Sequence, residues 1–135
     1  MKKIVLLMSL VGLWSCSHDD EYDNYHPEYL PIESATFPTE LKKDSVYEIP
    51  LQYIRPSTCH VYEGLYYSKN SNTRTIAVAT TVLEQSNCAT APVNPLTVIL
   101  NFKPTTETSY IFKLWKGEDA NGQDIFEETE IPVVP

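Results

Sequence analysis

Positive charge is scarce in this chain of 135 residues, and its scarcity excludes several kinds of partner. Lysine and arginine together number 10 against 18 aspartate and glutamate residues, which gives a formal net charge of −8. No basic residue occurs between Lys3 and Lys42. The phosphates of nucleic acid and anionic lipid headgroups would repel such a chain. We therefore expect no nucleic-acid partner, and any membrane contact has to come from another source.

Histidine is also scarce, which limits the catalytic options. Only His60 lies beyond the acidic N-terminal segment, which contains His18 and His26. A Ser-His-Asp relay would therefore have to use His60, and no Gly-x-Ser-x-Gly motif is present. The preceding residue, Cys59, would point to the opposite face of a strand and could not act with His60 as a nucleophile pair. We expect a non-enzymatic protein with no catalytic residues and no cofactor.

A calcium loop is the one metal site that the acidic residues suggest. Asp119 to Asp124, with Glu130 further on, partly resembles the ligand order of an EF-hand. However, Asp124 stands where that loop needs glycine. Asn121-Gly122 is instead typical of a hairpin turn, because both residues tolerate positive φ. We expect a turn here and no metal site.

Long hydrophobic runs are absent as well. The apolar run at residues 4–13 is half of the roughly 20 residues that a membrane-spanning helix needs. It follows Lys2 and Lys3 and ends in Leu13-Trp14-Ser15-Cys16, as a processed export signal does. This stretch resembles the lipobox of bacterial lipoproteins, although Trp14 is bulkier than usual. The resemblance implies a signal peptide at residues 1–15 and a lipid anchor on Cys16; the alternative is an ordinary cleaved signal.

Residues 16–31 are acidic and contain little to bury, which predicts a flexible tether. The acidic run behind Cys16 resembles the surface-export signal of Bacteroidetes lipoproteins. That resemblance implies an outer-membrane protein that faces outward, whereas a solvated spacer on the periplasmic side is the alternative.

The cysteine count agrees with an anchor. If Cys16 carries lipid, Cys59 and Cys88 remain as an even pair. An exported protein reaches an oxidising compartment, so we expect a Cys59–Cys88 disulfide. Two reduced, buried cysteines are the alternative.

From residue 32 to the C-terminus, threonine, tyrosine, valine and isoleucine dominate, and turn residues recur about every ten residues. This pattern predicts one antiparallel β-sandwich of about seven strands, with no helix. Pro50 cannot donate to a ladder, so its strand should lie at an edge or contain a bulge. The expected strands are 32–37, 45–54, 59–67, 74–84, 96–103, 109–116 and 123–134.

The strand at 109–116 carries a resemblance. Thr108 to Leu114, followed by Asp119 and Gly122, resembles the penultimate strand and turn of immunoglobulin-like and fibronectin type III-like sandwiches. The resemblance implies that the Tyr110 hydroxyl forms a hydrogen bond with the nearby backbone, an arrangement known as a tyrosine corner. The whole chain resembles the small outer-membrane lipoproteins of Bacteroidetes, a family that implies no particular activity.

Exposed rings are the remaining functional candidates. Trp115 alternates away from the face of Tyr110, Phe112 and Leu114, which we expect to be the core. Trp115, Tyr62 and Tyr66 could form a platform for a sugar face or a protein. The alternative is that Trp115 is a core partner whose burial is restored by a bulge or by a covering N-terminal segment.

We therefore expect a binding or adhesion module whose partner is a protein or a glycan. Two other classes remain open. A structural subunit of an outer-membrane complex would need a broad apolar patch or an open edge near Pro50. A small hydrolase would need a deep pocket containing His60 and a carboxylate.

Overall fold

The computed structural model describes residues 24–92 and 94–135, and within them the chain is all-β. It has nine strands and no helix in these ranges, so no helix there is long and apolar enough to cross a membrane. Residues 1–23 contain the expected signal peptide and Cys16, which therefore lie outside the described residues. The strands are β1 (Tyr25–Leu30), β2 (Ser34–Ala35), β3 (Leu41–Lys42), β4 (Tyr47–Tyr53), β5 (His60–Asn70), β6 (Thr73–Leu83), β7 (Leu96–Phe102), β8 (Ser109–Glu118) and β9 (Asp124–Val134).

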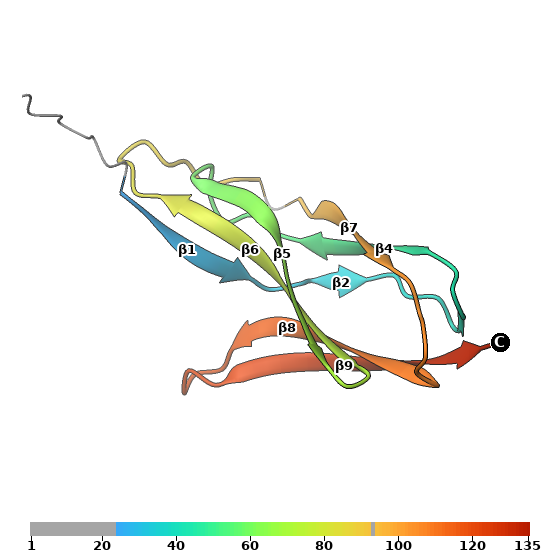
Figure 1. The fold of residues 1–135 in the computed structure, drawn as a ribbon. Helices are drawn as coiled ribbons and strands as arrows, with labels where there is room; N and C mark the ends of the chain where they lie inside the picture. The colour runs from blue at the N-terminus through green and yellow to red at the C-terminus, as the bar shows by residue number, and fades with distance from the viewer. Residues whose placement is uncertain (1–23, 93) are drawn as a thin grey trace, which may run out of the picture.

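The described strands form two sheets, and the larger sheet has six strands (Figure 1). Its order is β1-β6-β8-β9-β3, and β5 pairs along the opposite edge of β6. The expected purely antiparallel sandwich is wrong in one respect, because the β6–β8 and β3–β9 pairs are parallel. Between β6 and β8 the chain leaves for the smaller sheet to form β7. It returns as β8 in the direction of β6, which gives the parallel pair.

The smaller sheet has the order β2-β4-β7, so β4 is its central strand. The expectation of an edge strand is therefore wrong for β4 as a whole, and the pairing of β4 with β7 passes Pro50 without a bulge. The Pro50 carbonyl accepts the Thr36 N–H at 3.0 Å, and a residue in a strand presents its N–H to the same side as its C=O. The reciprocal bond to Thr36 is missing because proline has no N–H. This loss coincides with the end of β2 at Ala35.

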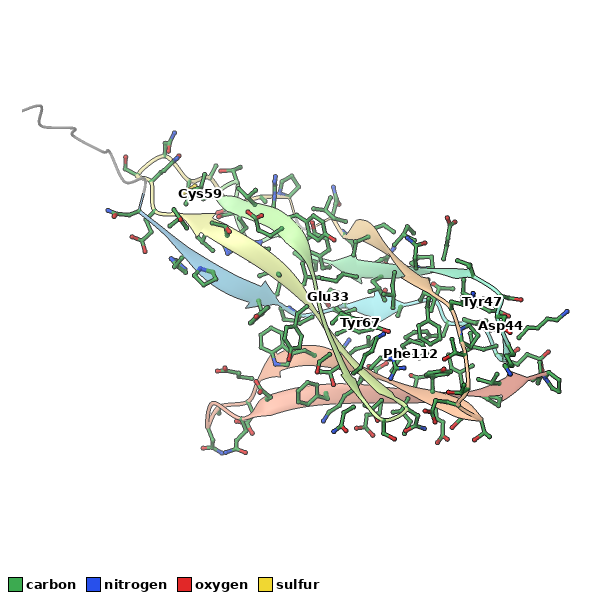
Figure 2. The ribbon with its side chains drawn as sticks, viewed as in Figure 1. Glu33, Asp44, Tyr47, Cys59, Tyr67 and Phe112 are labelled. Atoms are coloured by element: carbon green, nitrogen blue, oxygen red, sulfur yellow. A yellow bond between two sulfur atoms is a disulfide. The ribbon has the colours of Figure 1, made fainter. Side chains whose placement is uncertain are left out.

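The core lies between the sheets and confirms most of the predicted alternation. Tyr110, Phe112 and Leu114 of β8 are at most 1% exposed. Phe112 stacks on Phe37 at a ring-centroid distance of 4.8 Å, and Figure 2 shows Phe112 between the two sheets. Leu96 begins β7 and is 41% exposed, whereas Leu100 and Phe102 further along this strand are buried.

The first strand corrects the expected tether. Residues 25–30 form β1, which pairs with the second half of β6 from Tyr25↔Leu83 to Leu30↔Val78. Five of its six residues are exposed and only Leu30 is buried. Composition gave no sign of this strand, because its stability comes from backbone pairing rather than from an apolar face.

The predicted disulfide is present. Cys59, just before β5, is joined to Cys88 in the irregular stretch between β6 and β7, with a Cα–Cα distance of 5.5 Å. That distance lies within the usual range for a disulfide. In Figure 2 Cys59 lies near the end of the molecule where β1 begins, away from the C-terminus. The alternative of two reduced cysteines is wrong.

Candidate functional site: an aromatic cleft at a strand fork

The partner of β6 changes halfway along one of its edges. From Thr73 to Ile76 this edge pairs with β8, and from Val78 to Leu83 it pairs with β1. Figure 1 shows the β8–β9 hairpin diverging from β1 and from the second half of β6. Ala77 stands at the point of divergence and makes neither pairing. We call this point the fork.

The side chains around the fork lie on the outer face of the larger sheet. Ile76 and Val78 are in the core, so Ala77 between them points outward. By the same alternation Tyr29 points outward beside buried Leu30, and Trp115 points outward beside buried Leu114. Trp115 is therefore not part of the core cluster, although it is half-buried rather than fully exposed.

A cleft of about 740 Å³ opens at the fork, and we call it the fork cleft. Ala77 is only 4% exposed although it faces outward, which makes it part of the cleft floor. Four aromatic residues from four strands line the cleft. The full lining consists of Glu28, Tyr29, Tyr66, Thr75, Ala77, Trp115, Glu118, Asp124 and Phe126.

The rings of the fork cleft form two pairs. Tyr29 of β1 and Tyr66 of β5 pack edge to face with centroids 5.4 Å apart, and they remain 51% and 43% exposed. Trp115 and Phe126 are directly opposed in the β8–β9 ladder and are both half-buried. Flat, partly exposed rings on rigid strands present apolar surface at little conformational cost.

Two carboxylates, Glu118 and Asp124, add polar groups to the fork cleft, and Asp124 is already held in place. Asp124 accepts a hydrogen bond from the Trp115 indole N–H at 2.9 Å, which fixes the plane of the indole. Glu28 also lines the cleft, but it alternates to the same face as buried Leu30, so its carboxylate points away from the rings and lies 2.8 Å from His60. No cation is among the residues that line the cleft, although the Lys113 ammonium lies 4.3 Å from the Phe126 ring centroid.

Two of the three predicted platform residues line the fork cleft, and the third does not. Trp115 and Tyr66 are there, whereas Tyr62 stacks on Tyr53 of the smaller sheet at 6.0 Å. A β-bulge separates Tyr62 from Gly64, which has a φ of 145°. Without the bulge, Tyr62 and Tyr66 would share a face; the extra residue turns Tyr62 to the opposite face.

The only histidine expected to serve a hydrolase is fixed in a local network. His60 is 8% exposed; its Nδ1 lies 2.7 Å from the Ser57 Oγ and its Nε2 lies 2.8 Å from Glu28. The Ser57 Oγ also accepts the Cys59 N–H at 3.2 Å. These bonds join the turn before β5 to β1 across β6. His60 does not line the fork cleft.

The acidic turn after β8 has a structural role for its first carboxylate. Asp119 Oδ1 accepts the backbone N–H groups of Asn121 and Gln123 at 2.8 and 3.0 Å, and Gly122 has a φ of 74°. This is the geometry of an Asx-capped hairpin turn, as the Asn-Gly pair predicts. Within residues 24–92 and 94–135, no group of three or more metal-ligating side chains comes together.

Sequence reasoning missed Tyr29, Phe126 and the carboxylates of the fork cleft. Tyr29 was assigned to the tether, and nothing in local periodicity shows that β1 and β8 share an edge of β6.

The comparisons with known proteins leave the site to be judged on its geometry. The chain matches no family model, no curated protein and no solved structure.

Proposed function

We propose that this protein is a lipid-anchored, non-enzymatic binding module whose fork cleft holds an uncharged saccharide. The observation that carries the proposal is the set of four rings, Tyr29, Tyr66, Trp115 and Phe126, around one open cleft. The apolar faces of sugar rings pack on such aromatic surfaces. The carboxylates beside them can accept hydrogen bonds from sugar hydroxyl groups.

An uncharged ligand is favoured by the charges around the fork cleft. The formal net charge of −8 and the lining carboxylates of Glu118 and Asp124 oppose an anionic sugar at this site. A cationic ligand would have to compete with Lys113, which already lies against the Phe126 ring. Hydroxyl groups face neither difficulty.

The proposed location is the outer membrane, with acyl chains on Cys16 and the folded body facing outward. Its support is the short apolar run, the lipobox-like Leu13–Cys16 stretch and the acidic residues behind it. Stable anchoring takes at least two acyl chains. Mass spectrometry of the mature N-terminus should find Cys16 as the first residue, with added acyl mass. Protease treatment of whole cells should then degrade the protein, and a protected protein would place it on the periplasmic side.

The fold is proposed to be immunoglobulin-like in its finer topology. The support is the predicted tyrosine corner, because the Thr105 N–H donates to the Tyr110 hydroxyl at 2.9 Å. The parallel pairing of β6 with β8 is a departure from the antiparallel sheets of that class. The proposal therefore concerns the β7–β9 region more than the N-terminal strands.

The chain offers a matched pair of variants for testing saccharide binding. Tyr66 and Tyr62 lie on the same strand and are 43% and 42% exposed, but only Tyr66 lines the fork cleft. A screen of immobilised neutral glycans should find a ligand for the wild-type protein. Tyr66→Ala and Trp115→Ala should each weaken its binding roughly tenfold or more, because a central aromatic contact contributes about 2 kcal/mol.

Tyr62→Ala is the control and should bind as wild type does. Thermal unfolding of each variant separates lost binding from lost folding. Equal losses in the Tyr62 and Tyr66 variants would refute the assignment of the cleft. If no glycan binds and the anchored protein instead retains a defined envelope complex, the alternative role as a structural accessory subunit replaces this proposal.

A further inference from the structure

A second cleft, of about 340 Å³, lies where the inner face of β5 and β6 meets β7 and the segment after it. We call it the basic cleft. Its position is separate from the fork cleft, and no residue lines both. Figure 2 shows Tyr67, one of its residues, near Phe112 between the sheets. The residues that line it are Tyr67, Lys69, Arg74, Leu100, Asn101, Phe102, Lys103 and Thr105.

The charge of this cleft is opposite to that of the protein. Three of the chain's 10 basic residues, Lys69, Arg74 and Lys103, line it, and no carboxylate does. None of the three forms a salt bridge within the described ranges. Three cations gathered without a counter-charge repel one another, and an acidic chain had many carboxylates available to pair with them. No protein carboxylate therefore balances the charge of this cleft.

Arg74 is a fixed part of this cleft rather than a mobile surface side chain. It is 9% exposed, and its Nη1 donates to the carbonyls of Ser71 and Thr73 at 2.8 and 3.1 Å. Its guanidinium lies 5.0 Å from the centroid of the Tyr110 ring. Its Nε is buried and has no hydrogen-bond partner among the described residues. A buried charge that lacks a carboxylate is costly to a folded protein unless something compensates it.

The charge of Arg74 also acts on two neighbouring tyrosines. Burial raises the pKa of the Tyr67 hydroxyl, and the charge of Arg74 opposes this rise. Burial also acts to raise the pKa of Tyr110, but hydrogen bonds from the Thr105 region and the charge of Arg74 outweigh it. The pKa of Tyr110 is consequently below its ordinary value.

We infer that the basic cleft binds a compact anionic group, a sulfate, a phosphate or a carboxylate, as a second ligand site of this protein. The ammonium groups of Lys69 and Lys103 supply the contacts that reach the open part of the cleft. Arg74 supplies a fixed charge beside them, and Asn101 and Thr105 also line the cleft. Charge-assisted hydrogen bonds of this kind are the stronger class. The inference does not depend on saccharide binding at the fork cleft.

The chain provides its own spectroscopic probe, because Arg55 and Arg74 are its only arginines. The full-length protein is titrated separately with sodium sulfate, sodium phosphate and sodium glucuronate, and sodium chloride keeps the ionic strength constant. The Nε–H resonance of Arg74 in ¹H–¹⁵N spectra should shift in a saturable way with at least one of these salts. The Nε–H resonance of Arg55, which lines neither cleft, should not follow the same curve. The anion that binds most tightly identifies whether the natural ligand group is a sulfate, a phosphate or a carboxylate.

Two double variants with equal loss of charge decide whether the site is specific. The double substitution Lys69→Gln and Lys103→Gln should weaken binding of the anion about tenfold, because each lysine provides a direct charge contact. Lys42→Gln with Lys43→Gln removes two exposed lysines elsewhere and should leave the affinity within about twofold. The inference is overturned if the Arg74 resonance does not saturate with any of the three salts. It is also overturned if both double variants weaken binding equally, because the effect would then be one of net charge.

Discussion

Removing the disulfide should cost this protein a large and calculable part of its stability. Cys59 and Cys88 are 29 residues apart, so their bond closes a loop of about 30 residues in the unfolded chain. The chain-entropy model assigns a loop of this length about 3.6 kcal/mol. The folded state should tolerate the loss, because hydrogen bonds hold the same loop. Thr58 and Ala89 exchange two of them, at 2.9 and 3.0 Å.

The variant should combine Cys59→Ala with Cys88→Ser, since Cys59 is 4% exposed and Cys88 is exposed. Urea unfolding at equilibrium measures the change, and a loss of about 3 to 4 kcal/mol lowers the midpoint by roughly 2 to 3 M for a domain of this size. Wild-type protein unfolded in the presence of dithiothreitol should show a similar loss and controls for the two side chains. A loss below about 1 kcal/mol in both experiments would refute the chain-entropy reasoning.

Two further substitutions test the core and the tyrosine corner. Phe112→Ala removes a fully buried ring between two other phenylalanines and should cost about 3 to 5 kcal/mol in urea unfolding. Ile125→Ala, at a residue that is 44% exposed, should stay within about 0.5 kcal/mol, and equal effects would contradict the assigned core. Tyr110→Phe removes the acceptor of the Thr105 N–H and should cost about 1 kcal/mol; an unchanged midpoint would show that this bond contributes nothing.

The sequence was most informative where one strand face is buried and the other is not. Tyr110, Phe112 and Leu114 alternate with less buried neighbours, so the core face of β8 and the outward direction of Trp115 followed from a period of two. The parity of the cysteines similarly predicted the Cys59–Cys88 bond. Both inferences depend only on residues within one strand or on a simple count.

The same reasoning could not predict which strands pair when they lie far apart in the sequence. β1 has one buried residue in six, and its partner β6 lies about fifty residues away along the chain. The fork cleft exists because β1 and β8 share one edge of β6, which no local pattern reveals. The mixed sheet was missed for the same reason.

One feature of the site could have been anticipated. An isolated glycine inside a strand pattern suggests a bulge, and Gly64 interrupts β5 between Tyr62 and Tyr66. Taking it into account would have separated these tyrosines onto two faces. The predicted platform would then have kept Tyr66 and lost Tyr62.

Fluorescence of Trp115 offers the most direct test of the fork cleft. The chain has two tryptophans, so Trp14→Phe leaves Trp115 as the only one, whether or not the N-terminal segment is retained. A neutral glycan selected by the screen should change the Trp115 emission saturably and protect it from iodide quenching. Tyr66→Ala should weaken this response and Tyr62→Ala should leave it intact. A glycan that binds the protein while the emission and quenching of Trp115 stay unchanged would contradict a saccharide site at the fork.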